Sequence, residues 1–264
     1  MRVAMIAVND PAGTACLMRQ ALHRHRAHSC RLVTLEQRYN FLFPKDLHLP
    51  WLDDSGLQEL EQTLHEADVL HFHMTADENL QLGPFALRDF LQGKALVHHH
   101  HGHPDFRGNP QKYQQKYKEL GRRNLLVSTP DLLHMLPGAQ WQPNFVPQKD
   151  EAWTPGLRPQ DGRIRLGHSP TRKELKNTKE LLAVHRRLQP SFPELELDII
   201  ENTPHTVCLA RKRICDIFFD HMQGYYGVSS LEALSQGVPV IAGLDAWNMR
   251  CIREFFHCNE LPWI

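Results

Sequence analysis

The sequence predicts an α/β protein with two doubly wound parallel sheets, and three observations support this prediction. Short apolar runs alternate with stretches of helical period, which is typical of βαβ units. The alternation stops in a proline-rich stretch and then starts again. The chain has 264 residues, which is enough for two domains that each bury a core.

The first half of the chain predicts strands and helices in alternation. The apolar run 2–8 predicts a buried strand, and the polar turn after it leads into a helix with Ala15, Met18 and Leu22 on one face. The other predicted elements of this half are a helix over 57–67, strands over 68–73, 94–99 and 124–129, a helix over 111–120 and a short helix from Pro130.

Residues 143–162 lose this periodicity and hold four prolines and two glycines, a composition typical of a linker. We therefore predict an N-terminal Rossmann-like domain over 1–148, a linker over 149–162 and a C-terminal Rossmann-like domain over 163–264. The second half predicts strands over 163–167, 195–201, 216–220 and 238–242, and helices over 181–188, 207–214, 228–235 and 247–256.

Composition limits the function classes. Thirty basic residues balance thirty acidic ones, so nucleic acid is not a predicted partner. Six cysteines without a CxxC pair indicate reduced thiols in a cytoplasm. No apolar run approaches the roughly 20 residues of a membrane span, so any membrane contact is expected to be peripheral.

Segment 216–243 carries the most specific pattern, a buried strand, a glycine-containing loop, a helix and a second buried strand. Ligands of open parallel sheets bind beyond the carboxyl ends of the strands. Backbone N–H groups of Gly227, Val228 and Ser229 at the helix start would favour an anion such as a phosphate. Glu232, one turn further on, could accept hydrogen bonds from ribose hydroxyls. Serine and glutamate are also ordinary residues of a first helical turn, which leaves a purely structural role open.

Segment 163–182 adds basic side chains after a predicted strand. Arg172, Lys173 and Lys176 lie near a helix start, where cations oppose the helix dipole. Arg172 and Lys176 therefore make more sense as partners of ligand phosphates, whereas we expect Lys173 to be a solvated surface residue.

The motifs GHSPT…LKNT and YYGVSSLEALSQGVPVIAG together resemble the C-terminal domain of the GT-B glycosyltransferases, specifically glycosyltransferase family 4. The resemblance implies that Lys176 and Arg172 hold the donor diphosphate and that Glu232 holds its ribose. The family has a second glutamate where this chain has Gly224, so contacts to the transferred sugar are expected from backbone and from Tyr225 or Tyr226.

The N-terminal half resembles the same family more loosely. Gly13 and Thr14 match a small loop near acceptor and phosphate, and His101-Gly102 matches a histidine beside the reacting sugar. After 247–256 the chain is short, so the helices that cross back to the first domain in this family are expected to be missing or shortened.

The resemblance implies a retaining glycosyltransferase with two domains facing a cleft. A UDP- or GDP-sugar is the expected donor, and a glycan, a lipid-linked molecule or a small molecule supplies the acceptor hydroxyl, in surface glycan synthesis. Lys176 and His101 are the predicted catalytic residues. We expect no metal, in keeping with the lack of an Asp-x-Asp triad. The expected location is the cytoplasm, with peripheral contact at the inner membrane left open.

Two alternatives remain open. The chain could bind a sugar nucleotide without turning it over, because Gly224 replaces an acidic residue. It could also be a metal-dependent hydrolase, because imidazoles and carboxylates are standard ligands of transition metals. The candidate ligands for that function are His71, His73, His98, His99, His100, His101, His103 and Asp105. Alternation along a strand would place His98 and His100 on one side and His99 and His101 on the other.

Overall fold

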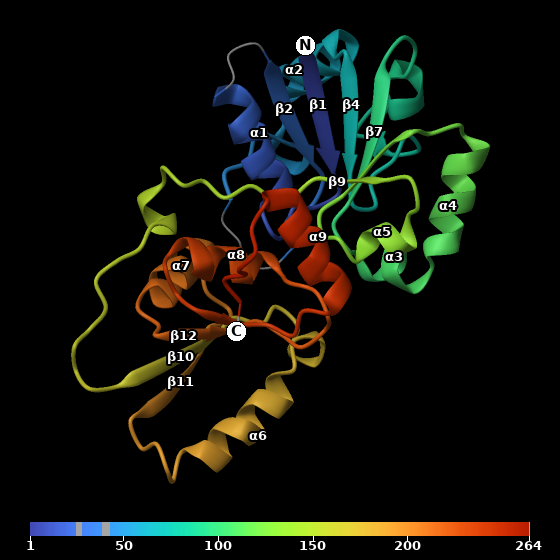
Figure 1. Ribbon diagram of the computed structural model, residues 1–264. Helices are drawn as coiled ribbons and strands as arrows, with labels where there is room; N and C mark the ends of the chain where they lie inside the picture. Colours follow the sequence, from blue (N-terminus) through green and yellow to red (C-terminus); the bar gives the residue numbers. More distant parts are fainter. Residues whose placement is uncertain (25–27, 39–42, 264) are drawn as a thin grey trace. The chain divides into compact units, whose positions relative to one another are not determined.

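The computed structural model describes residues 1–24, 28–38 and 43–263, and the chain divides into two compact units (Figure 1). Unit 1 consists of Met1–Arg38 with Phe43–Phe145, and unit 2 begins at Val146. Each unit has a parallel sheet with helices packed on it, which confirms the predicted α/β class. Among the described residues, no helix combines the length and the apolar character that crossing a bilayer requires.

The sheet of unit 1 has the strand order β3-β2-β1-β4-β7-β8-β9, with every neighbouring pair parallel. Its strands are β1 (Arg2–Ala7), β2 (Ser29–Thr34), β3 (Leu47–His48), β4 (Val69–His73), β7 (Ala95–His100), β8 (Asn124–Val127) and β9 (Gln140–Trp141). A separate hairpin joins β5 (Gln81–Leu82) to β6 (Phe85–Ala86). The strand order reverses between β1 and β4, and such a switch point favours ligand binding at the carboxyl ends of the strands.

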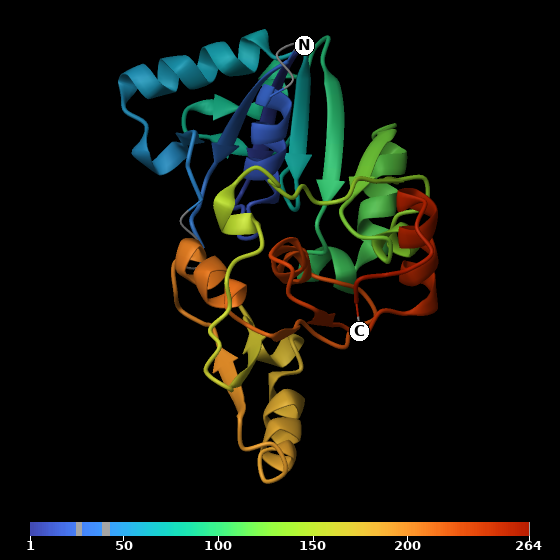
Figure 2. The ribbon, with the colours of Figure 1, turned by 60° about the vertical axis from the view of Figure 1, so that its left-hand side comes forward.

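Alternation along β1 fills two cores, one on each face of this sheet. The helices are α1 (Thr14–Arg24), α2 (Asp54–Glu66), α3 (Pro104–Gly108), α4 (Pro110–Glu119) and α5 (Leu132–Met135), with 3₁₀ turns η1 (Leu49–Trp51) and η2 (Leu87–Phe90). Ile6 packs with Leu64 of α2, whereas Met5 packs with Ala15 of α1. The two helices therefore cover opposite faces (Figures 1 and 2).

Strand β2 was not predicted from the sequence. Arg31 lies in its middle, and Cys30 and Leu32 beside it are buried. The guanidinium of Arg31 is compensated by Asp46, with Nη2 and Oδ1 2.9 Å apart. The charge is thus neutralised by a residue distant in sequence, which periodicity cannot show.

Unit 2 has a four-stranded parallel sheet in the order β11-β10-β12-β13. Its elements are η3 (Glu151–Trp153), β10 (Ile164–His168), η4 (Lys173–Leu175), α6 (Thr178–Leu188), β11 (Leu195–Ile199), α7 (His205–Arg213), β12 (Ile217–Phe219), α8 (Val228–Ser235), β13 (Val240–Ile241) and α9 (Ala246–Phe256). Phe218 packs with Ala233 of α8, and Phe219 packs with Leu181 of α6. Adjacent residues of β12 thus fix helices on opposite faces.

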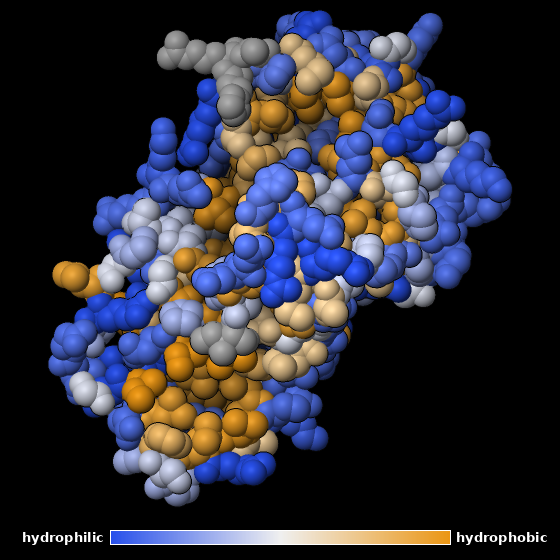
Figure 3. Space-filling model, viewed as in Figure 1, coloured by the Kyte–Doolittle hydropathy of each residue, from blue (hydrophilic) through white to orange (hydrophobic). Residues whose placement is uncertain are grey.

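The segment 149–162, predicted as a linker, lies within unit 2. Trp153 is 4% exposed, and the side chain of Gln236 donates a hydrogen bond to the carbonyl of Ala152 at 2.6 Å. Apolar side chains also reach the surface of this unit, around β11 and α6 in Figure 3. Leu182 and Leu188 of α6 are 37% and 38% exposed.

Candidate functional site

The buried carboxylate of Asp220 anchors the start of α8. Asp220 directly follows β12 and is 2% exposed. Its Oδ2 accepts hydrogen bonds from the backbone N–H of Gly227 and from the hydroxyl of Ser230, each at 2.7 Å. The helix dipole favours a negative charge there. Asp220 was not among the predicted site residues, although an acidic residue at the carboxyl end of a strand was a readable signal.

Lys176 reaches the same helix start. Its Nζ lies 2.6 Å from Oδ1 of Asp220, and a Cβ added to Gly227 would lie 2.9 Å from that Nζ. Burial alone would raise the pKa of Asp220, but the charge of Lys176 and the hydrogen bonds to the carboxylate hold that pKa well below its usual range. The carboxylate stays ionised and keeps the ammonium beside the helix start, where the lysine side chain is 19% exposed.

The other two basic residues of this loop form ion pairs elsewhere. Nε of Arg172 donates to Glu174 at 2.8 Å, and both side chains are exposed. Lys173 pairs with Glu201 at 2.8 Å. The structure therefore brings Lys176, but neither Arg172 nor Lys173, to the ion pair with Asp220.

Two backbone donors of α8 remain available for an anion. Gly227 gives its N–H to Asp220, so that predicted donor is already engaged. In the described parts of the chain, no acceptor bonds the N–H of Val228 or Ser229, which are the first two residues of the helix. The hydroxyl of Ser229 lies 3.2 Å from that of Ser169, which follows β10.

Glu232, the predicted ribose ligand, lies in a buried ionic network. It is 5% exposed, its Oε1 accepts a hydrogen bond from Nε2 of His205 at 2.7 Å, and its Oε2 pairs with Nζ of Lys212. Lys212 is fully buried and its ammonium also lies 4.8 Å from the ring centre of Phe218. Neither partner was predicted, because α7 contains several cations and periodicity does not tell which of them points inward.

Gly224 and Tyr226 have structural explanations. Gly224 has φ +88°, a conformation that favours glycine, and its carbonyl accepts hydrogen bonds from the backbone of Asp245 and the side chain of Asn248. A glutamate at this position would be strained. Tyr226 is 3% exposed and its ring lies 5.2 Å from that of Trp263, so its surface is mostly used within unit 2.

The loop at Gly13 and Thr14 forms the start of α1. Gly13 has φ +67°, and a Cβ there would overlap the ring of Phe43 at 2.3 Å. Thr14 is buried and its hydroxyl donates to Oδ1 of Asn144 at 3.1 Å. The carboxylate of Asp10 accepts hydrogen bonds from two N–H groups of the first turn of the helix. The loop is therefore a rigid cap, with an acidic group already at its helix start.

Four histidines of unit 1 gather on one face of the sheet. His71 and His73 of β4 stack at 4.3 Å between ring centres, and His73 is paired in register with His99 of β7. The ring of His99 lies 4.3 Å from that of His101, which follows β7. Nε2 of both His71 and His73 and Nδ1 of His99 are buried without a hydrogen-bond partner. Each such buried polar atom costs about 1–3 kcal/mol.

His101 is half-buried and uses both ring nitrogens within unit 1. Its Nε2 lies 2.9 Å from Nδ1 of His73, and its Nδ1 is hydrogen-bonded to the hydroxyl of Ser128. Burial lowers the pKa of His101 to about 3, so the imidazole is neutral at pH 7. A hydrogen bond to a sugar would have to replace one of these two contacts.

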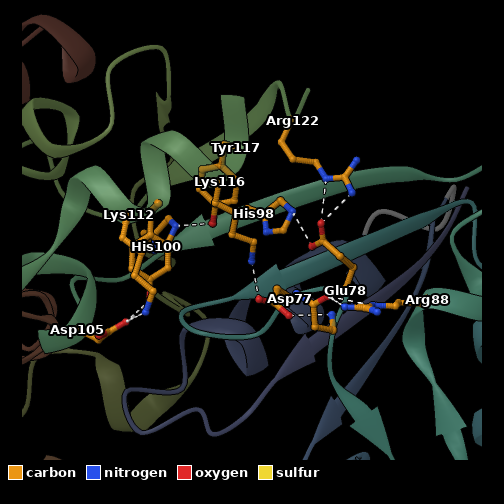
Figure 4. Close-up of polar contacts among 12 residues, drawn as sticks. Asp77, Glu78, Arg88, His98, His100, Asp105, Lys112, Lys116, Tyr117 and Arg122 are labelled. Carbon is orange, nitrogen blue, oxygen red and sulfur yellow. Dashed lines mark hydrogen bonds and ion pairs between the residues drawn. The ribbon is translucent and has the colours of Figure 1, made fainter. Parts of the chain in front are cut away.

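His98 and His100 point to the other face of β7, in keeping with the expected alternation (Figure 4). His100 bonds the hydroxyl of Tyr117 at 2.8 Å, and Nε2 of His98 lies 3.5 Å from Oε2 of Glu78. Oε1 of Glu78 accepts from Arg122 at 2.8 Å. These two histidines therefore do not share a site with the other four.

Neither His103 nor Asp105 joins the histidine group. Nδ1 of His103 accepts from the backbone N–H of Asp105 at the start of α3. The carboxylate of Asp105 binds the hydroxyl of Tyr113 and lies 3.4 Å from Nζ of Lys112. The eight candidate metal ligands are thus divided, and among the described residues only His71, His73 and His99 are close enough together to share an ion.

No protein-family model matches this chain, and no curated protein matches it by sequence. Solved structures do match. Sucrose-phosphate synthase from Thermosynechococcus elongatus has a TM-score of 0.53 and 14% identity over 96% of this chain and 84% of its own. An O-GlcNAc transferase from Thermobaculum terrenum has a TM-score of 0.51 and 17% identity over 97% of this chain, which spans 55% of that protein.

A third match is the S. aureus protein MnaA in complex with UDP, with a TM-score of 0.50 and 14% identity over 92% of this chain and 79% of its own. Identities this low establish the fold and no more. Together with the two parallel sheets, these structural matches show that the chain has the two-domain GT-B fold.

Proposed function

We propose that this chain is a glycosyltransferase that takes a sugar from a nucleoside-diphosphate sugar, with Lys176 and the start of α8 as the diphosphate site. The ion pair of Lys176 with Asp220 beside that helix start is the observation that carries the proposal. It places a cation next to two available backbone donors at the positive end of a helix dipole. The fold supports it, because a protein with this fold is named as an O-GlcNAc transferase.

The proposed chemistry is stabilisation of the leaving diphosphate. Negative charge grows on the diphosphate as the sugar departs, and preorganised donors aimed at that charge supply the largest catalytic contribution in many enzymes. Lys176 would neutralise it together with the N–H groups of Val228 and Ser229. Asp220 is a positioning residue, since it holds both the ammonium and the first turn of α8.

The finer assignments extend this proposal. Glu232 holds the ribose through the lone pairs that Lys212 and His205 leave on its carboxylate. His101 positions the transferred sugar, and Gly13 and Thr14 line the acceptor side. The reaction retains the anomeric configuration and uses a UDP- or GDP-sugar without a metal. It builds surface glycans. The enzyme acts in the cytoplasm, in peripheral contact with the inner membrane.

Nucleotide-dependent thermal stability tests the donor site. We expect UDP or GDP, at 100 times its Kd, to stabilise the fold by about 2.7 kcal/mol. That corresponds to a rise of roughly 5–10 °C in Tm for a chain of this size. The chelator-treated full chain is measured with UDP, GDP, ADP and TDP. Lys176→Gln should lose most of the rise relative to its own nucleotide-free Tm.

Lys173→Gln is the matched control, since it lies in the same loop but pairs with Glu201 on the surface. It should keep the full nucleotide response. If no nucleotide raises the Tm of the wild type, the donor site does not exist and the proposal fails. An equal loss in both lysine variants would mean a general charge effect, which also contradicts it.

A sugar-nucleotide-binding protein without transferase activity is the second candidate. Gly224 favours this candidate, because its backbone conformation is unfavourable for the glutamate that glycosyltransferase family 4 has at this position. Nucleotide binding without release of UDP or GDP from any donor, across a panel of hydroxyl acceptors, would support this candidate over the transferase.

A further inference from the structure

Three histidines of unit 1 lie at the spacing of a metal site. His71, His73 and His99 each place one ring nitrogen within 4.8 Å of the corresponding nitrogens of the other two. Their side chains come from the neighbouring parallel strands β4 and β7 and are at most 4% exposed. A tetrahedral zinc site has Zn–N distances of ~2.0–2.1 Å, so its nitrogens are roughly 3.4 Å apart. Small side-chain rotations would close the group to that spacing.

The hydrogen bonds of these rings also have the pattern of metal ligands. Each of the three keeps one buried nitrogen with no hydrogen-bond partner, namely Nε2 of His71, Nε2 of His73 and Nδ1 of His99. On two of the rings the second nitrogen is held. Nδ1 of His73 contacts His101 at 2.9 Å, and Nε2 of His99 contacts the hydroxyl of Ser128 at 3.2 Å. A ligating histidine typically has its other ring nitrogen fixed in this way.

The rings are suited to bind an ion without first losing a proton. Burial lowers the pKa of His71 to about 3, and it holds the pKa of His73 and of His99 well below the usual range. Only the neutral imidazole is a ligand. The position of His98 does not offer an equivalent ion site, because the guanidinium of Arg122 already pairs with Glu78 beside it.

We propose that His71, His73 and His99 together bind one divalent transition-metal ion of the zinc class. Three imidazoles suit Zn²⁺, Co²⁺, Ni²⁺ and Cu²⁺ and are poor ligands for Mg²⁺ or Ca²⁺. They leave the fourth position of a tetrahedral site to a water molecule. This metal site goes beyond the proposed sugar transfer, because the ion takes part in no step of that reaction.

Metal binding would also fix the tautomer of His101. An ion on Nε2 of His73 leaves the proton of that ring on Nδ1, which then donates to Nε2 of His101. The proton of His101 must consequently lie on Nδ1 and point to Ser128. The metal site thus sets which nitrogen of His101 carries a proton. This effect needs no residue of unit 2.

The test uses the full-length chain, stripped with a chelator and free of nucleotide. Co²⁺ is titrated while the visible absorption is recorded, and zinc retained after desalting is measured by mass spectrometry. We expect one equivalent of either ion per chain and the intense absorption bands of tetrahedral Co²⁺. His71→Gln and His99→Gln should each weaken binding by about 100-fold or more, beyond the loss that an outer hydrogen-bond partner causes.

His100→Gln is the matched control, because it lies on β7 next to His99 but faces Tyr117. It should bind Co²⁺ within about twofold of the wild type. The wild type alone can refute the proposal, whatever the variants do: no retained zinc, or only the faint absorption of octahedral Co²⁺ spread over surface histidines, means that no such site exists. An equal loss in His100→Gln would also overturn it. None of these results depends on whether a nucleotide binds unit 2.

Discussion

At the scale of single residues, Glu232 and Lys212 form an ion pair that is almost completely buried. Lys212 is fully buried and Glu232 is 5% exposed. Burial would raise the pKa of Glu232, but the charge of Lys212 and the hydrogen bond from His205 lower it to about 2. Such a pair is weak proof of added stability, yet removing one partner leaves an uncompensated charge in the core.

The pair makes a prediction for acid stability. The pKa of Glu232 is lower in the folded chain than in the unfolded one, so its contribution is present above about pH 4.5 and is lost as the pH falls toward 2. The loss amounts to roughly 3 kcal/mol of unfolding free energy. Urea unfolding at a series of pH values should show this decline in the wild type.

Glu232→Gln should be less stable at pH 7 by about 3–5 kcal/mol, because Lys212 loses its partner. Its stability should also fall less steeply with acid, since the titrating group is gone. The exposed Glu254→Gln serves as control and should follow the wild type. Parallel pH curves for wild type and Glu232→Gln would show that this carboxylate does not carry the effect.

The residues of the proposed donor site were predictable to different degrees. Lys176 and Ser229 were predicted because their motifs are specific, and the structure places Lys176 beside the start of α8. Asp220 was missed although it stands at the carboxyl end of a predicted strand, because its contact with the helix start seven positions later leaves no local pattern. Lys212 was missed for a related reason, because it was one cation among several on α7. Contacts between segments decided these cases, and a single sequence does not show them.

At the scale of elements, the start of α8 is tightly fitted around Gly227. The φ of Gly227 is −99°, so backbone conformation does not explain why a glycine occupies this position. A Cβ there would lie 2.9 Å from both Oδ2 of Asp220 and Nζ of Lys176. The space is thus needed by the ion pair.

Gly227→Ala should therefore destabilise the chain by about 1–3 kcal/mol through overpacking. Gly108→Ala is the matched control, because nothing lies within 4 Å of its added Cβ and its φ is ordinary. That change should stay within about 0.5 kcal/mol of the wild type. Urea midpoints of both variants measure the difference, and equal midpoints would refute the tight fit.

Elements with strong apolar periodicity were predicted well, while short or charged ones were not. The helix over 228–235 matches α8 residue for residue, and the strand over 195–201 shortens to β11. Strand β9 escaped notice because two residues carry no periodicity. Periodicity thus locates elements that bury a regular face, and it fails where burial depends on a partner elsewhere in the chain.

At the scale of the whole molecule, each unit has cores of its own. The clusters of unit 1 and those of unit 2 share no residue. The fold class follows from this repetition of strand and helix, which is why it was predictable from the sequence. The division itself falls at 145/146, where the proline-rich stretch begins to pack onto unit 2.

A core variant tests the separateness of these cores. Phe218 is fully buried in unit 2, so Phe218→Ala should cost about 3–5 kcal/mol. Hydrogen exchange should become faster in β10 to β13, while β1, β4 and β7 stay protected. Phe192→Ala, at 46% exposure, should leave both sheets unchanged. Faster exchange throughout unit 1 in the Phe218 variant would contradict the separation.

The four consecutive histidines 98–101, the first three of which end β7, have a consequence for the accuracy of folding. In most strands a slip of one residue exchanges apolar and polar faces and is rejected for that reason. Within residues 98–101 a slip of one residue replaces one histidine by another. This run therefore contributes almost nothing to the choice of strand register. The strand register must therefore be set by residues at the two ends of this run. Leu96 packs against the apolar core before it, and Gly102 has a φ of +78°, which suits a position after the end of the strand.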